Sequence, residues 1–62
     1  MQVELKEVIK LLDEKGYNPS EQLKGYIILG NDKYITRHGN ARELVKKINK
    51  SDIIDYLRGL NI

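Results

Sequence analysis

The chain has 62 residues, with no Cys, one His and a formal net charge of +2 from 11 Lys and Arg against 9 Asp and Glu. A chain of this length has a marginal core, because it buries only about 60% of the surface that its unfolded form exposes. The composition excludes disulfides and a structural zinc site, and the charge by itself is too small for a nucleic-acid footprint. We therefore expect one domain over residues 1–62, without metal or cofactor, that supplements its core by self-association.

No stretch of the sequence approaches the roughly 18 consecutive apolar residues that a membrane span needs. The first residues, MQVELKEVIK, are charged and amphipathic and lack the apolar region of a signal peptide. We therefore expect a cytoplasmic protein without a membrane partner.

The first predicted helix runs from about Gln2 to Lys15. Gly16 favours its end there, because glycine adopts without strain the left-handed conformation that often terminates a helix. The apolar residues recur three and four positions apart, as on one face of a helix: Leu5, Val8, Ile9 and Leu12.

The second predicted helix continues to Leu29 and is capped by Asn18, with Pro19 at its first position and Glu21 completing a capping box. Gly25 inside this helix costs about 1 kcal/mol relative to Ala. This cost indicates close approach by another backbone, or the glycine is simply tolerated. The inner face is expected to contain Leu23, Tyr26 and Ile27, with Ile28 available for a second contact.

A short extended segment is expected near residues 33–36, where Tyr34, Ile35 and Thr36 have strand-forming composition. Three residues cannot make a stable strand alone. The segment is therefore either an ordered loop or a strand that pairs with another element, for example its own copy in a dimer.

Two further helices are predicted in the last third of the chain. The third begins at Asn40, with Glu43 in capping-box position, and the fourth is capped by Ser51, with Asp52 in its first turn. Their apolar stripes are Ala41, Leu44, Val45 and Ile48, then Ile53, Tyr56, Leu57 and Leu60. The predicted fold class is mostly α, a small four-helix domain with the extended segment, in a homodimer.

No catalytic pattern is recognisable in the sequence. It contains no Gly-rich phosphate loop and no HExxH motif. His38 is the only His, and a loop His without a positioned partner is more often a surface hydrogen-bonding group than a catalyst. We therefore expect no enzymatic activity.

A basic side between Arg37 and Lys50 keeps open an alternative function, a small nucleic-acid-binding module. About ten residues separate the second and third helices, whereas a helix-turn-helix joins its helices with about three or four. Glu43 and Asp52 also dilute the positive charge, so a solvated helix face is favoured over a nucleic-acid surface. The cluster comprises Arg37, His38, Arg42, Lys46, Lys47 and Lys50.

An ordered set of motif residues covers the middle of the chain: Lys15-Gly16-Tyr17-Asn18-Pro19, Gln22, Gly25-Tyr26, Gly30, Tyr34-Ile35-Thr36 and Asn40-Ala41-Arg42. From about Glu14 to Leu57 the sequence resembles the IreB family, short regulatory phosphoproteins of Gram-positive bacteria. Their usual pattern is similar to KGYNPxxQxxGYxxSGDPxYITxHxNAR. Here the residues LGNDK at 29–33 replace the SGDP-like turn.

The resemblance implies a helical homodimer without enzymatic activity, acting downstream of a membrane Ser/Thr kinase that senses cell-envelope stress. The implied partners are a second copy and a Ser/Thr kinase or another pathway protein. Family members commonly carry phosphorylatable threonines in an N-terminal tail, whereas Thr36 is the only Thr here. Thr36 is therefore the candidate phosphosite, although a β-branched residue in a short extended segment is the favoured explanation of this position.

We expect the motif residues to form a surface for a dimer or a partner. Tyrosine combines a large apolar area with a hydroxyl, which suits a core edge as well as an interface. Arg42 is predicted to have an anionic or carbonyl partner, because the helix dipole disfavours a cation in the first turn. The expected surface comprises Tyr17, Gly25, Tyr26, Tyr34, His38, Asn40 and Arg42.

Overall fold

The computed structural model describes residues 3–60 and contains four α-helices, one 3-10 turn and no strand in that range. The elements are α1 (Val3–Glu14), α2 (Pro19–Leu29), η1 (Asp32–Tyr34), α3 (Ala41–Lys46) and α4 (Lys50–Gly59). The predicted mostly α, four-helix fold is therefore confirmed. The expected helix start at Gln2 lies outside the described residues.

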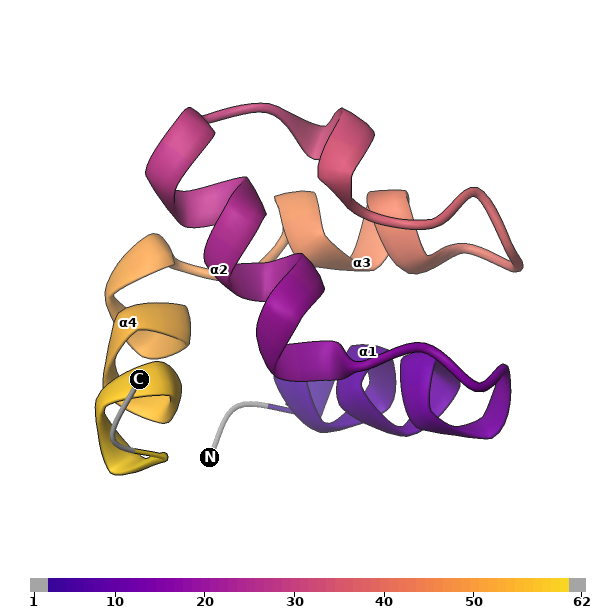
Figure 1. Cartoon of the computed structure of the whole chain (residues 1–62), viewed down its shortest axis with the longest axis horizontal. Helices are drawn as coiled ribbons and strands as arrows, with labels where there is room; N and C mark the ends of the chain where they lie inside the picture. The colour runs from indigo at the N-terminus through magenta and orange to yellow at the C-terminus, as the bar shows by residue number, and fades with distance from the viewer. Residues whose placement is uncertain (1–2, 61–62) are drawn as a thin grey trace.

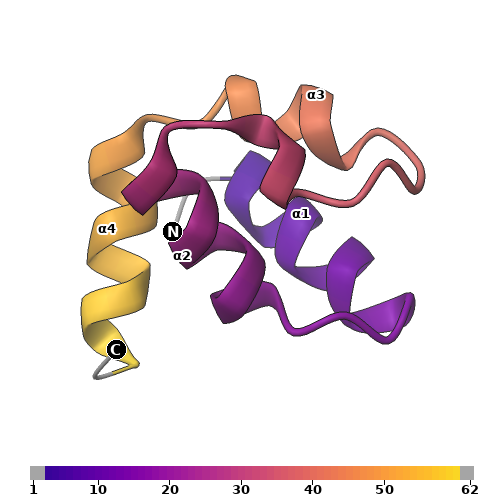
Figure 2. The same ribbon diagram turned by 45° about the horizontal axis from the view of Figure 1, so that its top comes forward.

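The helix α2 lies at the centre of the arrangement. It contacts α1, α4 and η1, while α1 also packs against α3. Figures 1 and 2 both show α4 at one end of the molecule and the loop between η1 and α3 at the other. The chain between α2 and α3 therefore crosses one side of the helical core.

The core takes apolar residues from every α-helix, one from the loop after η1 and one, Ile48, from the turn between α3 and α4. Ile35 is the loop residue, and it is fully buried. Most residues of the predicted stripes are buried. Ile9, Ile27 and Tyr56 are only partly buried against the core, and Leu60, which follows the last residue of α4, is exposed. The buried set is Leu5, Val8, Leu12, Leu23, Tyr26, Ile35, Ala41, Leu44, Val45, Ile48, Ile53 and Leu57.

The end of α1 has the hydrogen bonds of a Schellman motif, as the glycine at its end suggested. Gly16 has a φ of 83° and donates its N–H to Asp13 O at 3.1 Å. Tyr17 donates its N–H to Leu12 O at 2.9 Å. The motif reverses the chain so that Tyr17 packs against the core.

The three predicted caps have different outcomes. Asn18 is confirmed, because its Oδ1 accepts the N–H of Glu21 at 3.3 Å. Asn40 precedes α3 as predicted, but its backbone (φ −109°, ψ 29°) is not extended and its side chain makes no capping bond. The prediction of Ser51 as a cap is wrong. Asn49 has extended backbone, and its carbonyl accepts the N–H groups of Asp52 and Ile53, so Ser51 lies inside α4.

Replacing Asn18 by Ala should lower the free energy of unfolding by about 0.5–2 kcal/mol, the usual loss for a helix cap. In a small domain this corresponds to a fall in melting temperature of about 4–8 °C per kcal/mol. Asn40→Ala should shift the melting temperature far less, because no side-chain bond is lost. Thermal melts by circular dichroism compare the two variants, and equal shifts would contradict the difference between the two caps.

The predicted extended segment is corrected in its first half. Lys33 and Tyr34 belong to the 3-10 turn, and Ile35 follows with extended backbone (φ −98°, ψ 136°). Asn31 Oδ1 accepts the N–H of Lys33, and Ile35 donates its N–H to Asp32 O, each at 2.9 Å. Local hydrogen bonds therefore satisfy backbone groups that a strand would have left to a partner.

Candidate functional site

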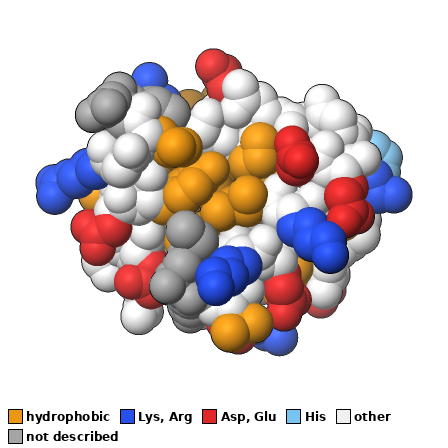
Figure 3. Space-filling model, turned by 90° about the horizontal axis from the view of Figure 1, so that it is seen from below, with side chains coloured by type: hydrophobic (Ala, Val, Ile, Leu, Met, Phe, Trp, Pro, Cys, Tyr) orange, Lys and Arg blue, Asp and Glu red, His pale blue; other side chains and the backbone are white. Residues whose placement is uncertain are grey.

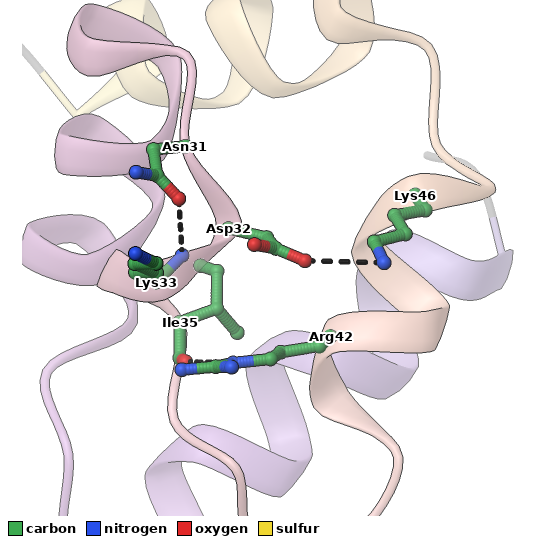
Figure 4. A network of polar contacts seen from close by, with 6 residues as sticks. All are labelled: Asn31, Asp32, Lys33, Ile35, Arg42 and Lys46. Carbon is green, nitrogen blue, oxygen red and sulfur yellow. Dashed lines mark hydrogen bonds and ion pairs between the residues drawn. The ribbon is translucent and has the colours of Figure 1, made fainter.

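Residues 30–40, called the connection below, are tied to the helices on both sides. Thr36 donates its backbone N–H to Gln22 Oε1 of α2 at 2.9 Å. Arg42 of α3 donates its Nε–H to the carbonyl of Ile35 at 2.9 Å, as Figure 4 shows. The carbonyl partner expected for Arg42 is therefore present, and it belongs to the connection.

Asp32 and Lys46 form a second tie between the connection and α3, with Oδ2 and Nζ 3.1 Å apart (Figure 4). The hydrogen bond from Lys46 lowers the pKa of the Asp32 carboxyl, while partial desolvation opposes this shift. Lys46 is mostly exposed, and ion pairs at the surface add little to stability. This pair therefore orients the 3-10 turn more than it stabilises the fold.

Gly25 makes room for the ring of Tyr34. A Cβ at Gly25 would lie 3.2 Å from Cδ1 and 3.3 Å from Cβ of Tyr34, closer than ordinary van der Waals contact. The close approach expected at this glycine is therefore real, but a side chain makes it and not another backbone. The contact fixes Tyr34 against α2.

Three large apolar side chains are exposed around this contact. Ile28 and Leu29 are 66% and 57% exposed, and Tyr34 is 51% exposed. Positions three and four after Gly25 lie on the same helix face as Gly25, so Ile28 and Leu29 lie beside the ring that covers it. We call Ile28, Leu29 and Tyr34 the apolar patch.

A polar cluster lies at the other end of the connection. His38 Nδ1 is 2.8 Å from the Tyr17 hydroxyl and 3.2 Å from Thr36 Oγ1. The Thr36 hydroxyl also accepts the backbone N–H of His38 at 3.2 Å. Tyr17 is half-buried against the core, so the cluster fastens an exposed turn to α1 and its C-terminal loop.

The structure divides the expected surface residues among different environments. Tyr34 belongs to the apolar patch and Gly25 lies beneath its ring, whereas Tyr17 and His38 form the polar cluster. Tyr26 belongs to the core, Arg42 anchors the connection, and Asn40 is exposed. The expected surface residues therefore do not form one continuous face. Leu29 was missed, because an apolar residue next to a helix-ending glycine carries no signal of exposure.

Four of the six residues of the basic cluster have partners within the chain, and His38 is one of them through the polar cluster. Arg42 bonds the Ile35 carbonyl, Lys46 pairs with Asp32, and Lys50 Nζ lies 5.8 Å from the ring centroid of Tyr26. These contacts give the cations structural roles that need no phosphate ligand. They support a helix face over a nucleic-acid surface.

The described range offers no metal-binding group, since no three His, Cys, Asp or Glu side chains in it gather closely enough. None of the helices in residues 3–60 is long and apolar enough to cross a membrane.

Comparison with known proteins gives a family and no structural neighbour. No solved structure matches the chain significantly. A family model described as IreB regulatory phosphoprotein matches residues 1–59 of the 62, which covers the four helices and the connection. The chain therefore belongs to the IreB family of regulatory phosphoproteins.

Proposed function

We propose that this single-domain chain is a non-enzymatic regulatory protein that acts as a homodimer. Its place is in the cytoplasm, downstream of a membrane Ser/Thr kinase in cell-envelope stress signalling. The regulatory role follows from the family. The observation that carries the proposed dimer is the apolar patch, with three large side chains more than half exposed at neighbouring positions.

The patch has the properties of a self-complementary interface. A two-fold dimer uses the same surface of each copy, so the interface would contain two copies of Ile28, Leu29 and Tyr34. Burying a large apolar side chain completely contributes about 1.5–3 kcal/mol, and these side chains have more than half of that area still to bury. The connection is already ordered by Gln22 and Arg42, so little conformational entropy is lost on association.

Ile28→Lys should convert the proposed dimer into a monomer, because it places a charge at the centre of an apolar interface. Sedimentation equilibrium should then report the 7.2 kDa mass of one chain, against twice that mass for the wild type. Val3→Lys is the matched control, since Val3 is equally exposed at 64% and lies on α1, outside the patch.

A wild-type protein that stays monomeric at high concentration would exclude the homodimer. A dimer that survives Ile28→Lys would exclude the apolar patch as its interface. Dissociation by Val3→Lys as well would mean that added charge alone drives the change.

Thr36 remains the proposed phosphorylation site on this chain. Its hydroxyl accepts a hydrogen bond from the backbone N–H of His38, and the residue as a whole is half-buried, so a kinase would need to open this turn first. A phosphate there would add negative charge next to Arg37 in the sequence. It would also lie one residue after Ile35, whose carbonyl accepts the hydrogen bond from Arg42. The consequence of modification would be a loosened connection and a changed apolar patch.

A further inference from the structure

A groove of about 660 Å³ opens between α1, α4 and the start of α2. Figure 3 views the molecule from the lower side of Figure 1 and shows apolar side chains gathered at the centre of that face, among acidic and basic ones. The apolar part of the groove is half-buried and the charged part is exposed. Its lining residues are Ile9, Pro19 and Tyr56, with Lys6, Lys10 and Asp13.

The charges along the groove are unequal at its two ends. Lys6 and Lys10 are four positions apart and lie on one face of α1, and Asp13 follows about one turn later. Lys6 makes no ion pair within residues 3–60, and Lys10 makes only a 3.9 Å contact with Glu14 in which both side chains are more than half exposed. Two available ammonium groups therefore precede a single carboxylate.

Tyr56 adds a neutral donor to the same groove. A tyrosine phenol is already protonated at neutral pH, and the burial of Tyr56 raises its pKa further above the ordinary value. Among the described residues this hydroxyl has no hydrogen-bond partner. A phenol O–H can donate to a carboxylate, which agrees with the two ammonium groups in favouring an acidic ligand.

The length of the lined stretch of α1 and the helical walls of the groove favour a short helix as the ligand. The stretch of α1 from Lys6 to Asp13 is about 10 Å long at a rise of about 1.5 Å per residue, which matches two helical turns. The walls are helices whose backbone groups are bonded internally, so they offer no sheet edge to an extended peptide. Recognition must therefore use side chains, as when an amphipathic helix enters an apolar groove.

We infer that this groove docks a short, acidic, amphipathic helix of a partner protein. Apolar side chains of that helix cover Ile9, Pro19 and Tyr56, and carboxylates one turn apart face Lys6 and Lys10. The site uses no residue of the apolar patch, so it gives the chain a second contact surface that goes beyond the proposed dimer.

The probe for this site is a fluorescein-labelled helical peptide of about 16 residues, long enough to hold a helix in water. It carries Leu at positions i, i+3, i+4 and i+7 with Glu on the flanks, and a matched peptide has Lys in place of each Glu. Fluorescence anisotropy should show tighter binding of the acidic peptide. Amide chemical-shift changes on binding should centre on Lys6, Lys10 and Tyr56.

Charge reversal tests the role of the two lysines. Lys6→Glu combined with Lys10→Glu should weaken the acidic peptide by about tenfold, because two attractions become repulsions at the edge of an apolar contact. The control combines Lys24→Glu with Lys47→Glu, which changes the net charge equally at exposed positions outside the groove. The control should change the affinity by less than about threefold, as expected for distant screened charges.

Equal affinity for the acidic and the basic peptide would overturn the proposal. An equal loss of affinity in the Lys24 and Lys47 control would overturn it as well, because the effect would then not be specific for the groove. Shift changes centred on Ile28 and Tyr34 would place the peptide on the apolar patch and overturn it as well. If the reversal of Lys6 and Lys10 dissociates a wild-type dimer, the groove is an interface between two copies of the chain, and docking of a partner protein is overturned. A monomeric wild type that still binds the acidic peptide would exclude the dimer and support the groove.

Discussion

Ile35→Ala should lower the free energy of unfolding by about 2–5 kcal/mol, the range measured when a large buried aliphatic residue is truncated. Ile35 lies in the connection, yet its side chain is fully buried among the helices. A domain of 62 residues is stable by roughly 3–9 kcal/mol at about 0.05–0.15 kcal/mol per residue. The variant should therefore lose a large part of its stability, which urea denaturation followed by circular dichroism measures.

Ile28→Ala is the matched control, because the same atoms are removed from a side chain that is 66% exposed. In the monomer it should change the free energy of unfolding by less than about 0.5 kcal/mol. If the proposed dimer forms, the effect of Ile28→Ala should grow with protein concentration, since association stabilises by mass action. The effect of Ile35→Ala should not depend on concentration in this way. Equal losses for the two variants at low concentration would contradict the burial of Ile35.

The first half of the fold was predictable because its local signals agree with one another. The apolar residues of α1 recur at helical spacing, Gly16 ends this helix, and Asn18 with Pro19 starts the next. Each of these signals acts within one turn of the chain. Short-range hydrogen bonding and the burial of one helix face therefore determine α1 and α2 without reference to distant residues.

The later boundaries were less predictable because competing local signals are present. Asn49 and Ser51 are both good cap residues, and the structure uses Asn49 without a side-chain bond. After α3, Ile48 donates its N–H to Val45 O and is itself buried, so the chain turns immediately before Asn49. Local propensity favours Asn49 and Ser51 equally as the start of α4. The burial of Ile48 goes together with the start at Asn49.

The candidate site depends on contacts between residues that are far apart in sequence. The bond from Thr36 to Gln22 and the contact of Tyr34 with Gly25 each join α2 to the connection, and no periodic pattern encodes them. The partner of Arg42 was predictable in kind, because a cation in the first turn of a helix needs compensation. That the partner is the carbonyl of Ile35 follows only from the folded arrangement.

Arg42→Ala should lower the free energy of unfolding by about 1.5–3 kcal/mol, the range for a hydrogen bond that includes a charged group. The lost bond joins Arg42 Nε to the Ile35 carbonyl in a partly buried position. Arg37→Ala is the control, because it removes the same charge from an exposed neighbour that makes no side-chain bond within residues 3–60. Arg37→Ala should change the free energy of unfolding by less than about 0.5 kcal/mol.

The loss of this anchor should also appear locally and in self-association. The amide of Thr36, bonded to Gln22, should exchange faster with solvent in Arg42→Ala than in the wild type, because opening of the connection exposes it. The connection carries Tyr34, which belongs to the apolar patch. The dimer of Arg42→Ala should therefore dissociate at a higher protein concentration than the wild-type dimer does. Arg42→Lys keeps the charge but lacks the Nε–H group, so it should retain most of the defect. If the Thr36 amide of Arg42→Lys exchanges as slowly as in the wild type and the dimer is as stable, the positive charge holds the connection in place and the bond to Ile35 does not.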